Sequence, residues 1–366
     1  MNRRPAAGPT RSIRQSLTVA VVAVVAAAAA SLGGCGRNAD SQIQLLAGST
    51  MGTRYSVQLA GARADEALAA DIQATLDRTE SLMSTYRPDS AISRFNAHPG
   101  TDWVAVAPAL CEVIAIATET SELSAGAFDV TLGPLVDLWG FGPEGDVDTR
   151  PSQDSIDTLL GSTGYEKLET DCRRPAIRKT IGSLEVDLSG IAKGHGVDQV
   201  AGLLEARGYT DYLVEVGGEM RARGRKPDDE AWRIAIEAPL REQRDILETL
   251  ELRDGAVATS GDYRNYFVAG GQHYSHLLDP RTGAPVRHAT AAVTVIAADT
   301  THADALATAL LILGKADGYA LAERENIAAL FVERVVQRNG TDVVVQPTSR
   351  YRSLSGHGTA DLATPQ

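Results

Sequence analysis

Glycine, lysine and histidine residues gather in the segment VDLSGIAKGHGVDQV, residues 186–200. This segment joins an apolar run typical of a β-strand to a pattern that predicts a helix. Its glycines let backbone N–H groups approach an anion, and Lys193 adds a positive charge at the helix N-terminus. The segment therefore fits either phosphate binding or a tight turn whose glycines only permit positive φ angles. Its spacing matches neither the dinucleotide-binding pattern nor the P-loop pattern.

A second pattern with chemical potential is the apolar helix expected at about 302–313, which follows a predicted strand at 291–297. Asp304 and Thr308 are four residues apart, so they share one face of this helix. A carboxylate and a hydroxyl on one face suit a hard cation such as Mg²⁺. The alternative is structural: Asp304 caps the helix or stabilises its dipole, and Thr308 bonds back to the helix backbone.

A third candidate is His276, which precedes the turn sequence LDPRTG. A histidine at a strand end can act as a general base near neutral pH, or it can be structural. Two further stretches contain aromatic residues beside polar ones: 82–96, with Tyr86, and the glycine-rich 124–142, with Phe128 and Trp139. Their aromatic rings either stack on a planar ligand or belong to the core.

The elements that must position these residues follow from hydrophobic periodicity. Helices are expected at 64–86, 108–123, 193–207 and 302–313, and strands at 53–61, 182–188, 211–216, 231–238, 255–259, 263–268, 273–278 and 291–297. After residue 180 the strands come in consecutive runs, which favours an α+β fold with a largely antiparallel or mixed sheet and flanking helices. The segment 346–366 is expected to be a disordered tail because it is rich in small and polar residues.

The N-terminus predicts export. Four arginines precede the uncharged run 17–30, which is the length of a signal-peptide core and shorter than a membrane span. The run ends in SLGGC, which resembles a bacterial lipobox. The resemblance implies a signal peptide at 1–34, lipid attachment at Cys35, a tether at 35–47 and a main domain at 48–345. We expect the protein on the periplasmic side, anchored to the inner or outer membrane. No later stretch is expected to span a bilayer.

Charge and cysteine content narrow the partners. The chain has a net charge of −12, and loss of the four arginines makes the mature protein more acidic, which argues against a nucleic-acid partner. An anionic ligand is still possible where a few cations or a metal invert the local field. Cys111 and Cys172 either form a disulfide in an oxidising compartment or remain buried thiols, and their spacing does not decide between these.

Eight stretches together resemble one family. In chain order they are MGTRYSV, LMSTYRPDSAISRFN, GAFDVTLGPLVDLWGFG, DLSGIAKGHGVDQV, LVEVGGEMRARG, ATSGDYRNYF, SHLLDPRTG and DALATALLILG. Their order, behind a lipobox, is similar to that of the ApbE family, the FAD:protein FMN transferases. Each stretch alone is a weak signal, but all eight in order are specific, and they cover roughly residues 48–335.

The resemblance implies a reaction. FAD binds with Mg²⁺ on its pyrophosphate, a Thr or Ser hydroxyl of an acceptor flavoprotein attacks the phosphate on the riboflavin side, and AMP leaves. Acceptors in this family carry a motif similar to D-[GA]-[ST]-[GS]-A-[ST], as in flavin-bearing subunits of ion-pumping redox complexes.

The resemblance also assigns roles to residues of this chain. It implies that Asp304, Thr308 and the Gly190 carbonyl bind the metal, and that His276 takes the proton of the acceptor hydroxyl. The implied FAD contacts are Met51, Tyr86, Ala127, Phe128, Asp129, Asp187, Lys193 and Leu278. His195 departs from the family pattern, in which an aromatic residue such as Tyr is commoner.

Two other functions remain open at this point. The same site would serve a FAD pyrophosphatase, in which water replaces the acceptor hydroxyl. A non-catalytic FAD-binding lipoprotein is the other alternative, and it would be expected to lack Asp304, Thr308 or His276, all of which are present.

Overall fold

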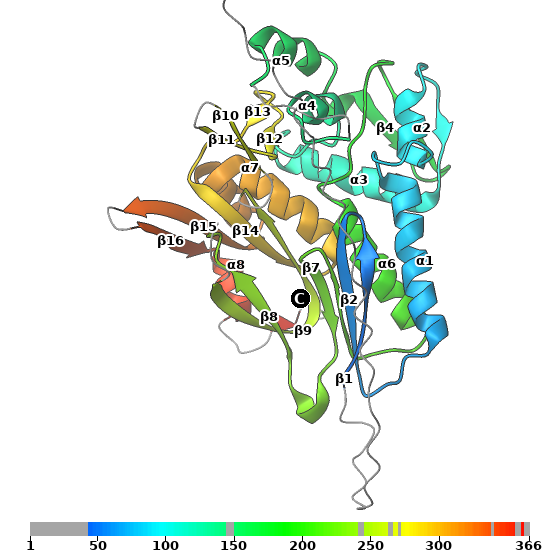
Figure 1. Ribbon diagram of the computed structural model, residues 1–366, viewed down its shortest axis with the longest axis vertical. Helices are drawn as coiled ribbons and strands as arrows, with labels where there is room; N and C mark the ends of the chain where they lie inside the picture. The colour runs from blue at the N-terminus through cyan, green and yellow to red at the C-terminus, as the bar shows by residue number, and fades with distance from the viewer. Residues whose placement is uncertain are drawn as a thin grey trace, which may run out of the picture. The chain divides into compact units, whose positions relative to one another are not determined.

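A ten-stranded sheet forms the centre of the structure (Figure 1). The computed structural model describes residues 43–143, 150–240, 245–262, 266–269, 272–337, 340–355 and 360–361. The strands, in their order across the sheet, are β1 (Ile43–Thr50), β2 (Thr53–Ala60), β6 (Tyr212–Val216), β7 (Glu219–Arg223), β9 (Ile246–Gly261), β14 (Thr290–Ala297), β15 (Ala328–Gln337) and β16 (Gly340–Pro347), while β8 (Trp232–Glu237) and β17 (Ala360–Asp361) also pair with β9. Every pair is antiparallel except β17 with β9, so the predicted fold class is confirmed.

The central strands of this sheet are buried on both faces, and their side chains alternate between these two faces. In β14, Val293 and Val295 pack on one face, and Ala292 and Ile296 pack on the other. The second face also contacts Trp232 of β8. The alternation therefore builds two hydrophobic layers, one on each side of the sheet.

Helices cover the first face. The helices of the described chain are α1 (Glu66–Met83), α2 (Ala91–Ala97), α3 (Pro108–Leu123), α4 (Gly133–Leu138), α5 (Gln153–Leu160), α6 (Ala192–Ala206), α7 (Thr300–Arg324) and α8 (Ser349–Ser355), with short 3₁₀ turns at Tyr165–Lys167 and Pro227–Asp229. Helix α7 packs on β9 and β14, α6 packs on β6 and β7, and α1 and α3 lie outside them (Figure 1). The predicted helices at 64–86, 108–123, 193–207 and 302–313 are thus confirmed.

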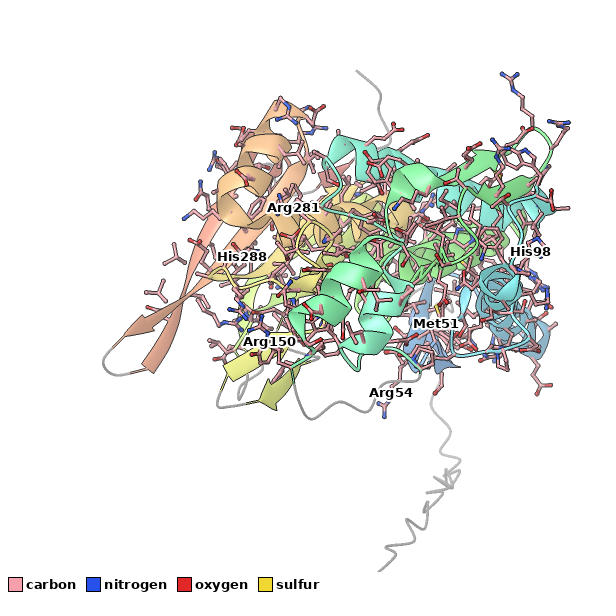
Figure 2. The ribbon with its side chains drawn as sticks, turned by 90° about the horizontal axis from the view of Figure 1, so that it is seen from above. Met51, Arg54, His98, Arg150, Arg281 and His288 are labelled. Atoms are coloured by element: carbon pink, nitrogen blue, oxygen red, sulfur yellow. A yellow bond between two sulfur atoms is a disulfide. The ribbon has the colours of Figure 1, made fainter. Side chains whose placement is uncertain are left out.

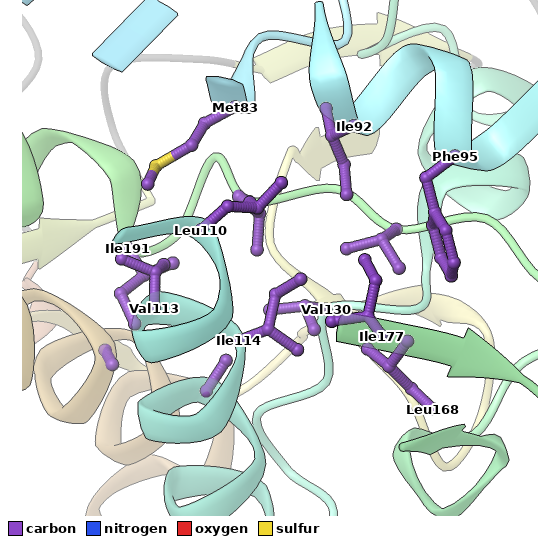
Figure 3. Close-up of a cluster of buried hydrophobic side chains, with 14 of the residues drawn as sticks. Met83, Ile92, Phe95, Leu110, Val113, Ile114, Val130, Leu168, Ile177 and Ile191 are labelled. Carbon is purple, nitrogen blue, oxygen red and sulfur yellow. The ribbon is translucent and has the colours of Figure 1, made fainter. Parts of the chain in front are cut away.

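A smaller region lies beside α3. It contains a three-stranded sheet with the order β3 (Val104–Ala105), β5 (Ala176–Lys179) and β4 (Leu168–Asp171). The remaining described strands form two hairpins, which are β10 (Tyr266–Ala269) with β11 (Gln272–Ser275) and β12 (Leu278–Asp279) with β13 (Ala284–Pro285). Side chains from α2, α3 and the small sheet form one buried cluster (Figure 3). Cys111 of α3 and Cys172 beyond β4 form a disulfide across this region. The sequence left their state open, and the structure pairs them.

The predicted strand at 182–188 is wrong. Leu184, Val186 and Leu188 alternate into the core as in a strand, but none of the strands that the structure describes pairs with them. Side chains take the partner strand's place: the Asn96 amide donates to the Val186 carbonyl at 2.9 Å and accepts from the Val186 N–H at 2.9 Å. The buried Lys179 ammonium donates to the Leu184 carbonyl at 3.1 Å. Periodicity reports which side chains are buried, and it does not report what pairs with the backbone.

Both ends of the domain extend beyond the expected bounds. Strand β1 begins at Ile43, inside the segment predicted as a tether, and it pairs with β2 along its whole length. At the other end, α8 lies inside the predicted disordered tail. Tyr351 and Leu354, three residues apart on α8, are buried against the sheet, so tertiary burial outweighs the polar composition. The predicted signal peptide and Cys35 lie outside the described residues.

Helix α7 is, against expectation, long and apolar enough to cross a membrane by length and composition alone. More than half of it is buried inside the domain, as expected for the core helix of a folded protein. Gly314 interrupts it with a φ of 71°, and a Cβ there would lie 2.7 Å from the ring of His288, which is labelled in Figure 2, so both the backbone and the space favour glycine. The predicted helix at 302–313 ends at this interruption.

Candidate active site

The glycine-rich segment serves the close approach of two helices. Gly190, Gly194 and Gly196 all lack positive φ angles, so the tight-turn alternative fails. A Cβ on Gly194 would lie 2.3 Å from the Thr300 carbonyl oxygen at the start of α7. Only glycine lets α6 and α7 approach this closely.

Asp304 lies at this helix crossing and is 2% exposed. Its Oδ2 accepts a hydrogen bond from the Gly194 N–H at 3.0 Å, across the interface between the two helices. The N-cap of α7 is Asp299, whose side chain accepts from the His302 N–H. Asp304 is therefore not the cap of α7, and its hydrogen bond instead goes to the first turn of α6.

Lys193 connects Asp304 to a second buried carboxylate. Its Nζ lies 3.0 Å from Oε1 of Glu219, the first residue of β7, and 3.6 Å from Oδ1 of Asp304. Glu219 is 3% exposed, whereas the Lys193 side chain keeps 31% exposure. Two buried carboxylates thus share one ammonium, which is carried by a side chain that is itself only partly exposed.

The pKa values of these groups follow from burial and mutual charge. Burial raises the pKa of Asp304, and the Lys193 ammonium and the Gly194 N–H offset part of this shift. Burial also raises the pKa of Glu219, against the attraction of Lys193. Burial alone lowers the pKa of Lys193, but Asp304 and Glu219 outweigh it, so the pKa is raised and the ammonium stays charged at neutral pH.

Thr308 and Gly190 complete an oxygen-rich site beside Asp304. The Thr308 hydroxyl pairs with the Ser260 hydroxyl of the neighbouring strand β9 at 2.8 Å. A Cβ on Gly190 would lie 3.6 Å from the Thr308 methyl group, which places the two residues in contact. A carboxylate, a hydroxyl and a backbone carbonyl are ligands that Mg²⁺ accepts, so these residues fit the expected metal. No cluster of three or more His, Cys, Asp or Glu side chains suited to a metal occurs among the described residues.

Two of the predicted FAD-contact residues lie beside this crossing. Met51, at the β1–β2 turn (Figure 2), has its methyl group 2.8 Å from the position that a Cβ on Gly196 would take. Asp187 lies in the extended segment that leads to Gly190, and its Oδ1 accepts from the Ser189 N–H at 2.7 Å.

Tyr86 is the most exposed predicted contact, with 65% of its surface accessible. Its hydroxyl donates to the Phe141 carbonyl at 3.1 Å. Partial burial raises the pKa of Tyr86, and the nearby carboxylates of Asp187 and Asp137 raise it further. An exposed aromatic ring near Asp187 is suited to stacking on a planar ligand.

The side chains of residues 127–129 are engaged in packing and in hydrogen bonds within the protein. Ala127 and Phe128 are buried, and the Phe128 ring lies 3.2 Å from where a Cβ on Gly190 would be. The Asp129 carboxylate accepts from the N–H and hydroxyl of Thr131, both at 2.7 Å, and from the Tyr165 N–H at 3.0 Å. Burial raises the pKa of Asp129, and these hydrogen bonds oppose the shift. The side chains of Ala127 and Phe128 thus belong to the core.

His276 is partly buried between β11 and β12. Its ring meets the edge of the Phe141 ring, with centroids 6.2 Å apart. The next residue, Leu277, packs in one cluster with Ala303 and Ala307 of α7. Leu278 is buried against Trp139 and its neighbours. The neighbour Leu277 thus packs with α7, and the His276 ring contacts Phe141, whose carbonyl accepts from Tyr86.

The structure brings Gly190, Lys193, Asp304 and Thr308 together, and it places Met51, Asp187 and Tyr86 around them. Sequence reasoning missed Glu219 and Ser260. The available signal for Glu219 was its place directly after two glycines in the largely apolar run LVEVGGEM, which also contains Glu215. Ser260 gave none, because its partner is 48 residues away in the chain.

Comparisons with known proteins identify the family. The family model described as "ApbE family" matches residues 51–331. The chain belongs to the ApbE family. A curated relative from Vibrio cholerae, named FAD:protein FMN transferase, is 43% identical over 304 residues, which cover 82% of this chain and 90% of the relative.

Solved ApbE structures share the fold. The apo flavinyl transferase ApbE from Pseudomonas stutzeri has 42% identity and a TM-score of 0.79, covering 86% of this chain and 97% of that one. The flavin transferase ApbE from Vibrio cholerae has 39% identity and a TM-score of 0.77, covering 85% of this chain and 99% of that one. The resemblance seen in the eight stretches is thereby confirmed.

Proposed function

We propose that this protein transfers FMN from FAD to a Thr or Ser hydroxyl of an acceptor flavoprotein, releases AMP and requires Mg²⁺. The single observation that carries the proposal is the buried Asp304 carboxylate. It lies one helical turn from Thr308 at the Gly190 corner, in a chain whose relatives are named FAD:protein FMN transferases. Membership of a transferase family makes an enzyme the leading interpretation.

The chemistry divides among the residues of the site. Asp304, Thr308 and the Gly190 carbonyl would hold Mg²⁺, which when bound supplies Lewis-acid polarisation of a phosphoryl oxygen. The acceptor oxygen forms a bond to the phosphorus on the riboflavin side, and the bond from that phosphorus to the bridging oxygen breaks, so this oxygen leaves with AMP. His276 accepts the proton of the acceptor hydroxyl.

The remaining residues would bind and orient FAD. Tyr86 offers an exposed aromatic face, and Lys193 offers a charged donor at the N-terminus of α6. Met51, Ala127, Phe128, Asp129, Asp187 and Leu278 would line the site, with the buried ones contributing backbone groups. Binding by this many fixed elements favours a single orientation of the phosphate.

We further propose that the protein is exported, cleaved after residue 34 and lipidated at Cys35, with the domain on the periplasmic side of the inner or outer membrane. The Cys111–Cys172 disulfide supports an oxidising compartment. The acceptor would be a flavoprotein with a motif similar to D-[GA]-[ST]-[GS]-A-[ST] in the same compartment.

The test is transfer to an acceptor domain carrying this motif, with FAD and Mg²⁺, followed by intact-mass measurement. We expect the mass of one FMN to be added to the acceptor, and we expect EDTA to prevent this. Asp304→Asn should abolish transfer, whereas Asp317→Asn, an exposed position on the same helix, should retain it. Full transfer by Asp304→Asn would overturn the metal assignment.

The same assay distinguishes the hydrolase. AMP formed at equal rates with and without the acceptor would favour a FAD pyrophosphatase, and FAD left intact in both would favour a binding protein. His276→Ala should slow transfer and leave FAD affinity largely intact. A collapse of FAD affinity instead would make His276 structural.

A further inference from the structure

Glu219, Lys193 and Asp304 form a buried cluster of two carboxyl groups and one ammonium. The two carboxylates are 3% and 2% exposed, and one ammonium lies between them. Glu219 Oε2 is buried and has no hydrogen-bond partner among the residues that the structure describes. Burial of unpaired charge is costly, so such a cluster favours a further cation.

The two oxygens of Asp304 are not equivalent. Oδ2 accepts the Gly194 N–H at 3.0 Å and is therefore occupied by the backbone of α6. Oδ1 faces the Lys193 ammonium at 3.6 Å, beyond the distance of a direct hydrogen bond. Oδ1 is thus the oxygen that a divalent cation would use, and Lys193 is its competitor.

Glu219 determines where the Lys193 ammonium rests. The Lys193 Nζ donates a hydrogen bond to Glu219 Oε1 at 3.0 Å, whereas Asp304 Oδ1 lies 3.6 Å from Nζ. The turn before Glu219, Gly217 and Gly218, has positive φ angles of 62° and 111°. A Cβ on Gly217 would lie 3.2 Å from Lys193 Cδ, so the glycine leaves room for the lysine side chain to reach Glu219.

We propose that Glu219 is a positioning residue, which holds the Lys193 ammonium away from Asp304 Oδ1 and leaves this oxygen for a divalent cation. The inference rests on the proposed function, because it assumes a cation at Asp304. Without the Glu219 carboxylate, Asp304 is the remaining buried partner of the ammonium. Lys193 would then pair directly with Oδ1 and compete with the cation.

The test measures binding of Mn²⁺ alone to the full domain, by the loss of the free-ion electron paramagnetic resonance signal. Glu219→Gln keeps the shape of the side chain, and we expect it to weaken Mn²⁺ binding at least tenfold. Lys193→Met should restore most of this loss in the Glu219→Gln background, and it should change affinity far less in the wild type. Asp317→Asn controls for the removal of one exposed negative charge.

The pattern of the double-mutant cycle decides the outcome. If Glu219 acts only through its charge, the two substitutions have additive effects on Mn²⁺ affinity, and additivity would overturn the proposal. If the wild type binds no Mn²⁺ while FAD binding persists, the metal part of the proposed function fails, and this inference fails with it.

A second measurement does not depend on the metal. A crystal structure of metal-free Glu219→Gln should show Lys193 Nζ within hydrogen-bond distance of Asp304 Oδ1. Nζ still more than 3.5 Å from Oδ1 would refute the positioning role even if the affinity falls. If Glu219→Gln does not fold, Glu219→Asp, with a shorter reach to the ammonium, should give a smaller loss of the same kind.

Discussion

Substitution of Gly194 by alanine should separate α6 from α7. The new Cβ would lie 2.3 Å from the Thr300 carbonyl oxygen and 2.8 Å from the Asp304 Cβ. Non-bonded atoms of this kind rest at about 3.5 Å, so the helices must move apart by about 1 Å. Both contacts involve atoms that rotation of a side chain cannot remove. We expect a loss of about 1–3 kcal/mol in the free energy of unfolding.

Two other glycines of α6 provide matched controls. A Cβ on Gly202 meets nothing within 4 Å, so Gly202→Ala should stabilise the helix by up to about 1 kcal/mol. A Cβ on Gly196 meets the flexible end of Met51 at 2.8 Å and Leu76 Cδ2 at 3.4 Å, so Gly196→Ala should fall between the other two. The free energy of unfolding of the alanine variants should therefore decrease in the order Gly202, Gly196, Gly194, as the added methyl group meets closer and less flexible atoms.

Urea denaturation of the three variants measures the series, and Mn²⁺ affinity measures its effect on the site. Gly194→Ala should weaken Mn²⁺ binding, because displacement of α6 moves the Gly194 N–H away from Asp304 Oδ2. Gly202→Ala should leave the affinity unchanged. A Gly194→Ala protein as stable as Gly202→Ala would refute the close helix crossing, and with it our account of the glycine-rich segment.

Three further predictions concern stability. Burial lowers the pKa of His195 to about 4, so between this value and about 6.5 the unfolded state binds a proton that the native state does not. Stability should therefore fall by about 2 kcal/mol from pH 7 to pH 5, and His195→Phe should remove this part of the pH dependence in urea titrations. Asn96→Ala should cost about 2 kcal/mol by unfolding free energy, because both backbone groups of Val186 lose their partners. Cys111 and Cys172 are 61 residues apart, so reduction of their disulfide should lower the free energy of unfolding by about 4 kcal/mol. The stability of a variant with both cysteines replaced by serine should not respond to dithiothreitol.

Local sequence patterns predicted the long elements well, because amphipathic periodicity and caps act within one segment. Helix α1 begins where Asp65 accepts the Leu68 N–H, and its apolar residues Leu68, Ile72 and Leu76 face the core at helical spacing. The same reasoning placed Asp304 and Thr308 on one helix face. It could not choose between a metal site and a cap, because that depends on Gly194, which lies 110 residues earlier.

The failures share one cause, which is pairing over long range. The 184–188 segment has the alternation of a strand, but Asn96, about 90 residues away, replaces the partner strand. Helix α8 has a polar composition, yet Tyr351 and Leu354 bury against strands that lie far away in sequence. Glu219 and Ser260 became visible as site residues only when β7 and β9 were placed beside α6 and α7.

The position of Asp304 is determined by helix packing, and not by a loop. Asp198, four residues after Gly194 on α6, accepts the N–H groups of Thr300 and Thr301 at 3.0 and 2.8 Å. Gly194 then donates to Asp304 one turn later on α7. These two sets of contacts lie one turn apart along α6 and also one turn apart along α7. Together they fix the register of α7 against α6. A carboxylate held between two packed helices is preorganised, as the phosphoryl transfer proposed for this site requires.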